Sequence, residues 1–218
     1  MSSPFPHSPS LPLFPAEKKA RDHALVASIG FLILLPLGTL IARYLRTFTN
    51  GWFWPHAAVN FLISGPVIFA GWALGIQANS RFGGTVSDAH KRIGTALMIL
   101  YIIQIFIGVF IHYVKIPIRI PGGRPPQNYL HAILGIVILA LASWQVHNGI
   151  YTEWPQITGN IHPVRQSAKH AWLALIIVFW ALYGLGLGFL PRQYKQESSR
   201  RSVNEKETPD GIKLSDAA

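Results

Sequence analysis

The sequence predicts an all-α membrane protein with five transmembrane helices, four of which form an up-down bundle. Half of its 218 residues are hydrophobic and only 13% are charged, whereas soluble domains carry about 25% charged residues. Five apolar stretches are long enough to cross a hydrocarbon core of about 30 Å, which takes about 20 residues. Their interiors contain no Asp, Glu, Lys or Arg. A third observation, the regular spacing of four histidines, points to a binding site inside the bundle.

The first two stretches run over roughly 24–42 and 52–77. Residues 1–22, rich in Ser and Pro, lack the short apolar core of a signal peptide, so we expect a polar N-terminal tail and a first helix that acts as the membrane signal. Pro36 and Pro66 lie inside the two stretches and predict bends, which membrane helices tolerate when the freed carbonyls find partners.

The remaining stretches run over roughly 93–114, 129–150 and 171–190. Gly- and Pro-rich breakers separate all five, at 49–51, 83–84, 121–126 and 155–163. Connections this short make neighbouring helices antiparallel. We therefore expect one transmembrane domain over 23–190, followed by a mixed-charge segment, 191–218, that predicts a disordered polar tail.

The net charge of +10 is spread over tails and short loops rather than gathered in one patch. This distribution favours the headgroups of a lipid bilayer as the partner and argues against nucleic acid. The absence of cysteine excludes a disulfide, a thiolate ligand and covalent haem attachment. Lys and Arg are nearly balanced between the two faces, with a slight excess that favours a cytoplasmic C-terminus.

Four histidines stand at the amino-terminal edges of the first four apolar stretches. They are His23, His56, His90 and His131, and similar lengths of chain separate each from the next. Because consecutive helices are antiparallel, His23 falls beside His90 at one face, and His56 beside His131 at the other. Imidazole is the commonest metal-binding side chain. Two bis-histidine pairs predict two b-type haems inside the bundle, with these histidines as axial ligands of the iron.

Residues near these histidines suggest how the haems would be held. Gly94 and Gly135 each follow a histidine by one helical turn, on the same helix face, and either clear space for a porphyrin or serve close helix packing. Arg92 is a candidate for neutralising a haem propionate or contacting a lipid headgroup. Asn60, one turn below His56, either donates a hydrogen bond near that haem or pairs with a neighbouring helix.

Among the other histidines, His112 is the strongest rival ligand. It lies about six helical turns after His90, so it points nearly the same way at the far face, where it competes with His56 or His131. His147 lies about 160° around the helix from His131 and is expected to face away. Three more lie in a tail or beside the fifth stretch and are not expected to bind haem: His7, His162 and His170.

Several motifs in family order carry a resemblance. They are Asp22-His23-Ala24, Leu35-Pro36-Leu37-Gly38, Ile41-Ala42-Arg43-Tyr44-Leu45, Trp52-Phe53-Trp54-Pro55-His56, Asp88-Ala89-His90-Lys91-Arg92-Ile93-Gly94, and Asn128-Tyr129-Leu130-His131 with Gly135. Over roughly 22–190 the chain resembles the cytochrome b561 transmembrane domain, in the version often found behind an extracellular DOMON domain.

The resemblance implies two haems b, one on His23 and His90 at the non-cytoplasmic side and one on His56 and His131 at the cytoplasmic side. It also implies a cytoplasmic C-terminus and oxidoreductase activity, with electrons passing from a cytoplasmic donor, often ascorbate, to monodehydroascorbate or ferric iron outside.

One departure concerns the donor. Ascorbate-using members have lysines before the second haem-binding helix, where this chain has 51–55, Gly-Trp-Phe-Trp-Pro. Cationic candidates for an anionic donor are instead Arg43, Arg46, Lys115, Arg119 and Arg124, unless these are topogenic charges.

The expected function is therefore that of a di-haem transmembrane oxidoreductase with small-molecule donor and acceptor. The alternatives are a haem-anchoring relay subunit for a partner oxidoreductase and a haem-free helical protein with interfacial histidines. A second copy of the chain or a redox partner protein is the expected macromolecular partner.

Overall fold

The computed structural model describes residues 11–83, 88–114 and 125–207, and these ranges are mostly helical, with no strand among them. It has five helices long and apolar enough to cross a membrane. The first crossing consists of α1 (Pro15–Ser28), a π-helical segment (Ile29–Leu34) and α2 (Leu35–Phe48). The second consists of a 3-10 turn (Asn50–Trp52), α3 (Phe53–Ala57), a π-helical segment (Ala58–Ile63) and α4 (Ser64–Arg81).

The third crossing is a single helix, α5 (Ala89–Tyr113). The fourth consists of α6 (Pro126–Asn148), a π-helical segment (Gly149–Glu153) and α7 (Trp154–Thr158), and the fifth is α8 (Gln166–Leu187). The five-helix all-α membrane fold predicted from composition is confirmed. The helices extend past the apolar stretches. For example, α1 begins at Pro15, about two turns before His23.

A π-helical segment precedes a proline in three crossings. The segments end at Leu34, Ile63 and Glu153, shortly before Pro36, Pro66 and Pro155 respectively. A helical proline lacks an N–H and presses its ring on the carbonyl of the preceding turn. A wider preceding turn shifts that carbonyl away. At Pro155 a chain break was expected, and the helix instead continues through the proline to Thr158.

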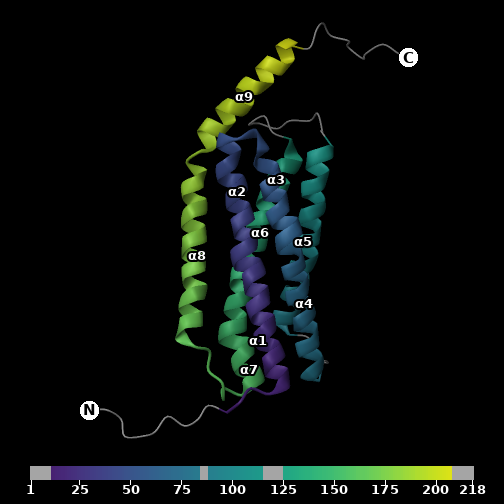
Figure 1. Ribbon diagram of the computed structural model, residues 1–218, viewed down its shortest axis with the longest axis vertical. Coiled ribbons are helices and arrows are strands. Elements are labelled where there is room, and N and C mark those ends of the chain that lie inside the picture. The colour runs from purple at the N-terminus through teal and green to yellow at the C-terminus, as the bar shows by residue number, and fades with distance from the viewer. Residues whose placement is uncertain (1–10, 84–87, 115–124, 208–218) are drawn as a thin grey trace, which may run out of the picture.

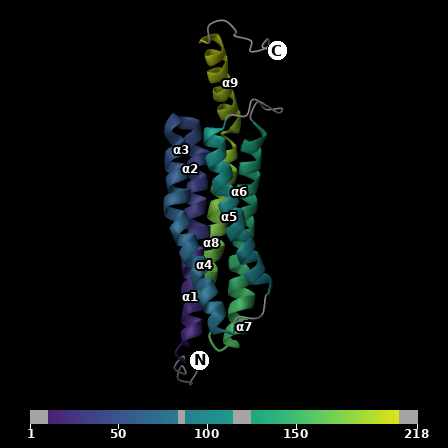
Figure 2. The ribbon, with the colours of Figure 1, turned by 90° about the vertical axis from the view of Figure 1, so that its right-hand side faces the viewer.

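The bundle is built from two antiparallel pairs. α1 packs along α4, and α5 packs along α6. Figure 2 shows the two pairs as two layers, with α8 lying where the layers meet. All five crossings contribute to one apolar core, which contains Leu35, Ile68, Leu97, Met98, Tyr101, Ile138, Leu139, Ala142, Phe179 and Tyr183. This closed core separates the two ends of the bundle.

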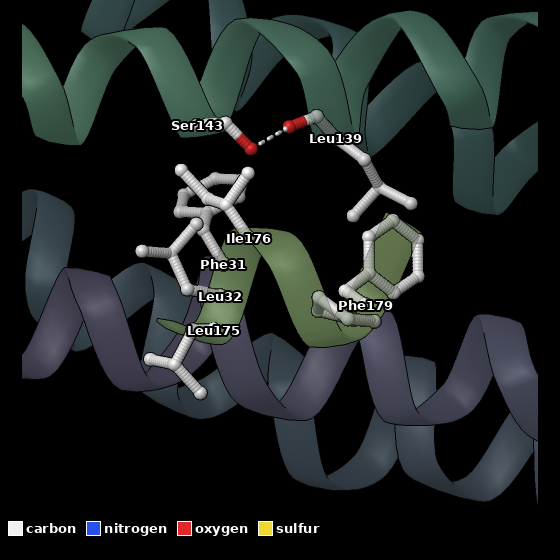
Figure 3. Close-up of a pocket in the computed structure, with 8 residues that line it drawn as sticks. Phe31, Leu32, Leu139, Ser143, Leu175, Ile176 and Phe179 are labelled. Carbon is white, nitrogen blue, oxygen red and sulfur yellow. Dashed lines mark hydrogen bonds between the residues drawn. The ribbon is translucent and has the colours of Figure 1, made fainter. Parts of the chain in front are cut away.

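α8 lies at the side of the bundle against α2 and α6 (Figure 1). Figure 3 shows where α8 meets the first and fourth crossings: a small apolar gap in which the Ser143 hydroxyl donates to the Leu139 carbonyl at 2.8 Å. The Trp172 indole N–H donates to the Ser143 carbonyl at 3.1 Å and ties α8 to α6. The gap is otherwise lined by Phe31, Leu32, Pro36, Leu175, Ile176 and Phe179.

The chain after Leu190 differs from the expected disordered tail. It forms a further helix, α9 (Leu190–Glu207), which extends beyond the end of the bundle (Figure 1). Arg46 of α2 pairs with Glu197 at 3.1 Å, and Gln193 is buried. Contacts with α2 therefore fix the start of this polar helix. Residues 208–218, like 1–10 in the expected N-terminal tail, lie outside the described residues.

Candidate haem sites at the two ends of the bundle

His23 and His90 lie together at one end of the bundle. Their ring centroids are 6.2 Å apart and their planes are nearly perpendicular, at 86°. α1 and α5 supply them from the first and third crossings, which run in the same direction. Both side chains are half-buried.

His56 and His131 lie together at the opposite end. Their ring centroids are 6.4 Å apart, with planes at 79°, and they come from α3 and α6. In Figure 1, α1 and α7 mark the end that holds the first pair, whereas α3 and α9 mark the end that holds the second. The structure thus brings together the histidines that helix alternation paired.

The separation within each pair fits one iron between two imidazoles. A bond of about 2 Å from metal to imidazole nitrogen, plus about 1 Å from that nitrogen to the ring centre, puts opposed ring centroids about 6 Å apart. Two protein ligands suffice for haem iron, because the porphyrin supplies the other four nitrogens. In the described part of the chain, no three His, Cys, Asp or Glu side chains gather as a bare metal ion would need.

Hydrogen bonds orient three of the four rings. Nδ1 of His23 donates to the Gly71 carbonyl at 2.7 Å, and Nδ1 of His56 donates to the Gly38 carbonyl at 2.8 Å. Nδ1 of His90 donates to the Asn148 side-chain oxygen at 3.1 Å. Because these oxygens accept hydrogen bonds, Nδ1 carries the proton and Nε2 keeps the lone pair that binds metal. Sequence reasoning missed all three partners.

The fourth ring, that of His131, differs. Its Nδ1 is buried and makes no well-aligned hydrogen bond in the described part of the chain, although the Gln104 backbone carbonyl lies near the ring. Gln104 of α5 reaches this residue, but its amide donates to the His131 backbone carbonyl, at 2.8 Å. In the same way the Gln145 amide donates to the His90 backbone carbonyl, at 2.6 Å. The two glutamines therefore hold the helix backbone at each histidine rather than the imidazole.

Glycines give these side chains room. A Cβ added at Gly94 would lie 3.2 Å from the Gln145 amide nitrogen, and one at Gly135 would lie 2.9 Å from that of Gln104. The two glycines singled out in the sequence therefore face glutamine amides. Other glycines face the rings: a Cβ at Gly108, Gly149 or Gly75 would lie 3.2, 3.3 and 2.9 Å from Cε1 of His131, His90 and His23.

α5 and the fourth crossing each carry one copy of the same set of residues. The two copies are separated by the spacing between His90 and His131. Each residue of the first set has its counterpart at this constant offset: His90 and His131, Gly94 and Gly135, Gln104 and Gln145, Gly108 and Gly149. The buried positions repeat likewise: Leu97 and Ile138, Met98 and Leu139, Tyr101 and Ala142. This internal repeat was the sequence signal that would have identified both glutamines.

Asn60 lies against a paired histidine, whereas Arg92 lies on the surface. The Asn60 side-chain nitrogen lies 3.0 Å from Nδ1 of His56, and its backbone carbonyl accepts from the Tyr101 hydroxyl at 2.6 Å. Because Nδ1 donates to Gly38, it has no lone pair for that nitrogen, and an Asn60 amide turned by 180° would present its oxygen as a second acceptor. Arg92 is exposed, about 200° around α5 from His90, so it lies on a different face from that histidine.

The remaining histidines occupy other surroundings. His112 stacks on Phe53, with ring centroids 3.8 Å apart and planes at 5°, so its ring packs on a neighbour of His56. His147 packs against Tyr151 and Trp172. His162 lies 3.6 Å from the buried Glu17, and His170 is exposed. His7 lies outside the described residues.

Two of the cationic candidates for a donor site can be placed. Arg43 donates to the Tyr183 hydroxyl at 3.4 Å, and Arg46 lies over the Trp52 ring at 4.8 Å while it pairs with Glu197. Both belong to α2, at the end of the bundle that holds His56. The other three candidates, Lys115, Arg119 and Arg124, lie outside the described residues.

Comparison with known proteins agrees with this geometry. The family model described as eukaryotic cytochrome b561 matches residues 22–154, which is more than half of the chain. No solved structure matches. Three Arabidopsis thaliana proteins, each named a cytochrome b561 and DOMON domain-containing protein, are similar to the chain. One is 29% identical over 167 residues, covering 74% of this chain and 37% of the relative.

The second is 35% identical over 91 residues, covering 41% of this chain and 22% of the relative. The third is 34% identical over 129 residues, covering 59% of this chain and 30% of the relative. The chain therefore spans well under half the length of these relatives. The family match takes in all four paired histidines, and the chain belongs to the cytochrome b561 family.

Proposed function

We propose that this chain is a di-haem cytochrome that moves electrons across a membrane, from a cytoplasmic donor at the His56–His131 end to an acceptor at the His23–His90 end. The observation that carries the proposal is the pairing of the histidines at 6.2 and 6.4 Å at opposite ends of one bundle. Bound haem b would supply one-electron chemistry, with His23 and His90 holding one haem and His56 and His131 holding the other.

The protein's part is to space the sites and to exclude water between them. His23 at one site and Gly38 at the other lie about four turns apart along the first crossing, which corresponds to about 22 Å of helix. That distance is most of the hydrocarbon core of about 30 Å. Between the sites lie buried Leu97, Ile68 and Tyr101, the last edge-on to Phe31 with centroids 6.4 Å apart.

An anionic donor such as ascorbate is supported by Arg43 and Arg46 at the His56 end of α2. Both guanidinium groups already contact side chains of the fifth crossing or α9, so a donor would have to share or displace these partners. Monodehydroascorbate and ferric iron are the acceptors that the family suggests for the other end. The proposed orientation places α9 and the C-terminus in the cytoplasm.

A second candidate is an electron relay for a partner redox protein. The names of the relatives favour it, since each joins a cytochrome b561 part to a DOMON domain, and this chain spans only part of their length. Copurification of a partner, together with no reductase activity of the chain alone, would distinguish the relay from the autonomous reductase.

Haem content of purified variants tests the proposal. We expect two haems b per chain, a dithionite-reduced b-type spectrum, and a loss of about half the haem in either His23→Ala or His56→Ala. His147→Ala, which alters a histidine held by Tyr151 and Trp172, is the matched control and should keep both haems.

If His56→Ala keeps all its haem and His112→Ala loses haem, then His112 and not His56 is the ligand at that end. The absence of any b-type spectrum would overturn the proposal. Proteoliposomes loaded with ascorbate should then reduce an external acceptor in the wild type and not in His56→Ala.

A further inference from the structure

The repeat in α5 and α6 is broken at one position next to the histidine rings. Asn148, which precedes Gly149, holds Nδ1 of His90. Its counterpart in the first copy of the repeat is Ile107, which precedes Gly108. Because Gly149 and Gly108 lie against the rings of His90 and His131 in the same way, Ile107 occupies the place from which an amide would serve His131.

We propose that Asn148 is a positioning residue that makes His90 a strong axial ligand, and that Ile107 leaves His131 the weakest electron donor of the four histidines. The inference rests on the proposed haem ligation and deepens it. It concerns how the chain sets the redox properties of each site, and it requires no change in the ligands themselves.

The chemistry of the ring nitrogens carries the argument. An acceptor on Nδ1–H makes an imidazole more basic at Nε2 and fixes its orientation, and partners of this kind are worth about 10–100-fold in metal affinity. A more basic ligand favours ferric over ferrous iron, so it lowers the reduction potential. His90 has a well-aligned acceptor in Asn148, whereas the buried Nδ1 of His131 has only the poorly aligned Gln104 backbone carbonyl nearby in the described part of the chain.

The opposite ligands do not share this difference. His23 has the Gly71 carbonyl, and His56 has the Gly38 carbonyl together with the Asn60 amide. The His56–His131 pair therefore combines one histidine with a well-aligned acceptor and one histidine with only a poorly aligned acceptor. For this reason the effect is best measured by local substitution at each site, not by comparing the two sites of the wild-type protein.

Reciprocal substitutions test the inference. In the His56→Ala background, which retains the His23–His90 site, Asn148→Leu should raise the midpoint potential by about 59 mV, a tenfold change in a one-electron equilibrium. In the His23→Ala background, Ile107→Asn should lower the potential of the His56–His131 site by a similar amount. Each substitution placed in the other background is the control and should leave the potential unchanged.

Asn148→Asp keeps an acceptor oxygen and should give a potential at or below that of the unaltered site. Electron paramagnetic resonance of the oxidised protein should show bis-histidine iron throughout. Unshifted potentials with intact bis-histidine spectra would overturn the inference and leave the proposed function standing. Absence of bound haem would overturn both. If Asn148→Leu fails to fold, Ile107→Asn decides the question, because it adds a side-chain acceptor where the described part of the chain offers the His131 ring no well-aligned one.

Discussion

Asp88 stands at the N-cap of α5, just before His90. Its carboxylate accepts from the Lys91 backbone N–H at 2.9 Å and pairs with the Lys91 ammonium, also at 2.9 Å. Burial by itself would raise the pKa of Asp88, but the two interactions with Lys91 outweigh it and hold the pKa below its ordinary value. The helix that carries a proposed haem ligand thus begins at a fixed, charged cap.

An acid-dependent stability follows from this cap. Because the folded-state pKa is lowered, the stabilisation is fully present above the unfolded value of about 3.9 and is lost as the pH falls through the lower folded value. We expect Asp88→Ala to cost about 1 kcal/mol at neutral pH. Asp88→Ser should keep most of the cap and lose this part of the acid dependence.

Thermal unfolding in detergent over a series of acidic pH values measures both effects. An Asp88→Ser protein with the same acid dependence as the wild type would contradict the assignment.

At the scale of elements, the apolar stretches were predictable because composition and length alone decide what crosses a bilayer. The ends of the helices were not. The first turns of α1 are polar, and they form because Pro15 starts the helix and the Glu17 carboxylate accepts from the Phe14 N–H at 2.7 Å. α9 likewise depends on α2, a contact distant in sequence that no local pattern reveals.

The docking of α9 leads to a prediction about Glu197. The Arg46–Glu197 pair is partly exposed, so it is worth about 0–1 kcal/mol. Glu197→Gln should therefore release the start of α9 and speed tryptic cleavage at Lys195 by up to about fivefold, without loss of haem. Ser198→Ala, at an exposed neighbouring position, is the control. Equal cleavage rates in the two variants would show that the ion pair does not hold the helix.

At the scale of the whole molecule, helix alternation predicted which histidines lie together, because their position on successive antiparallel helices fixes their end of the bundle. The oxygen atoms that hold the rings could not be found in this way. Gly71 and Gly38 act through backbone carbonyls, which any residue possesses, and Asn148 reaches His90 from a distant part of the sequence. Only packing in three dimensions selects these particular groups.

The orientation of the molecule is open to a direct test, because the chain contains no cysteine. Ser198 in α9 and Gln166 at the start of α8 are exposed and lie at opposite ends of the fifth crossing. With α9 in the cytoplasm, Ser198→Cys in intact cells should react only with a membrane-permeant maleimide. Gln166→Cys should react with an impermeant one, and the reverse pattern would invert the proposed direction of electron flow.

The hydrogen bonds of the first two crossings run in both directions: His23 donates to Gly71 on the second, and His56 donates to Gly38 on the first. Each of these two crossings therefore carries a paired histidine at one end of the bundle and, at the other end, the carbonyl that orients its neighbour's histidine. If one helix slid past the other by a single turn, about 5.4 Å, His23 and His56 would lose these two hydrogen bonds at once. The register of the first two crossings therefore sets the orientation of one histidine ring at each end of the bundle.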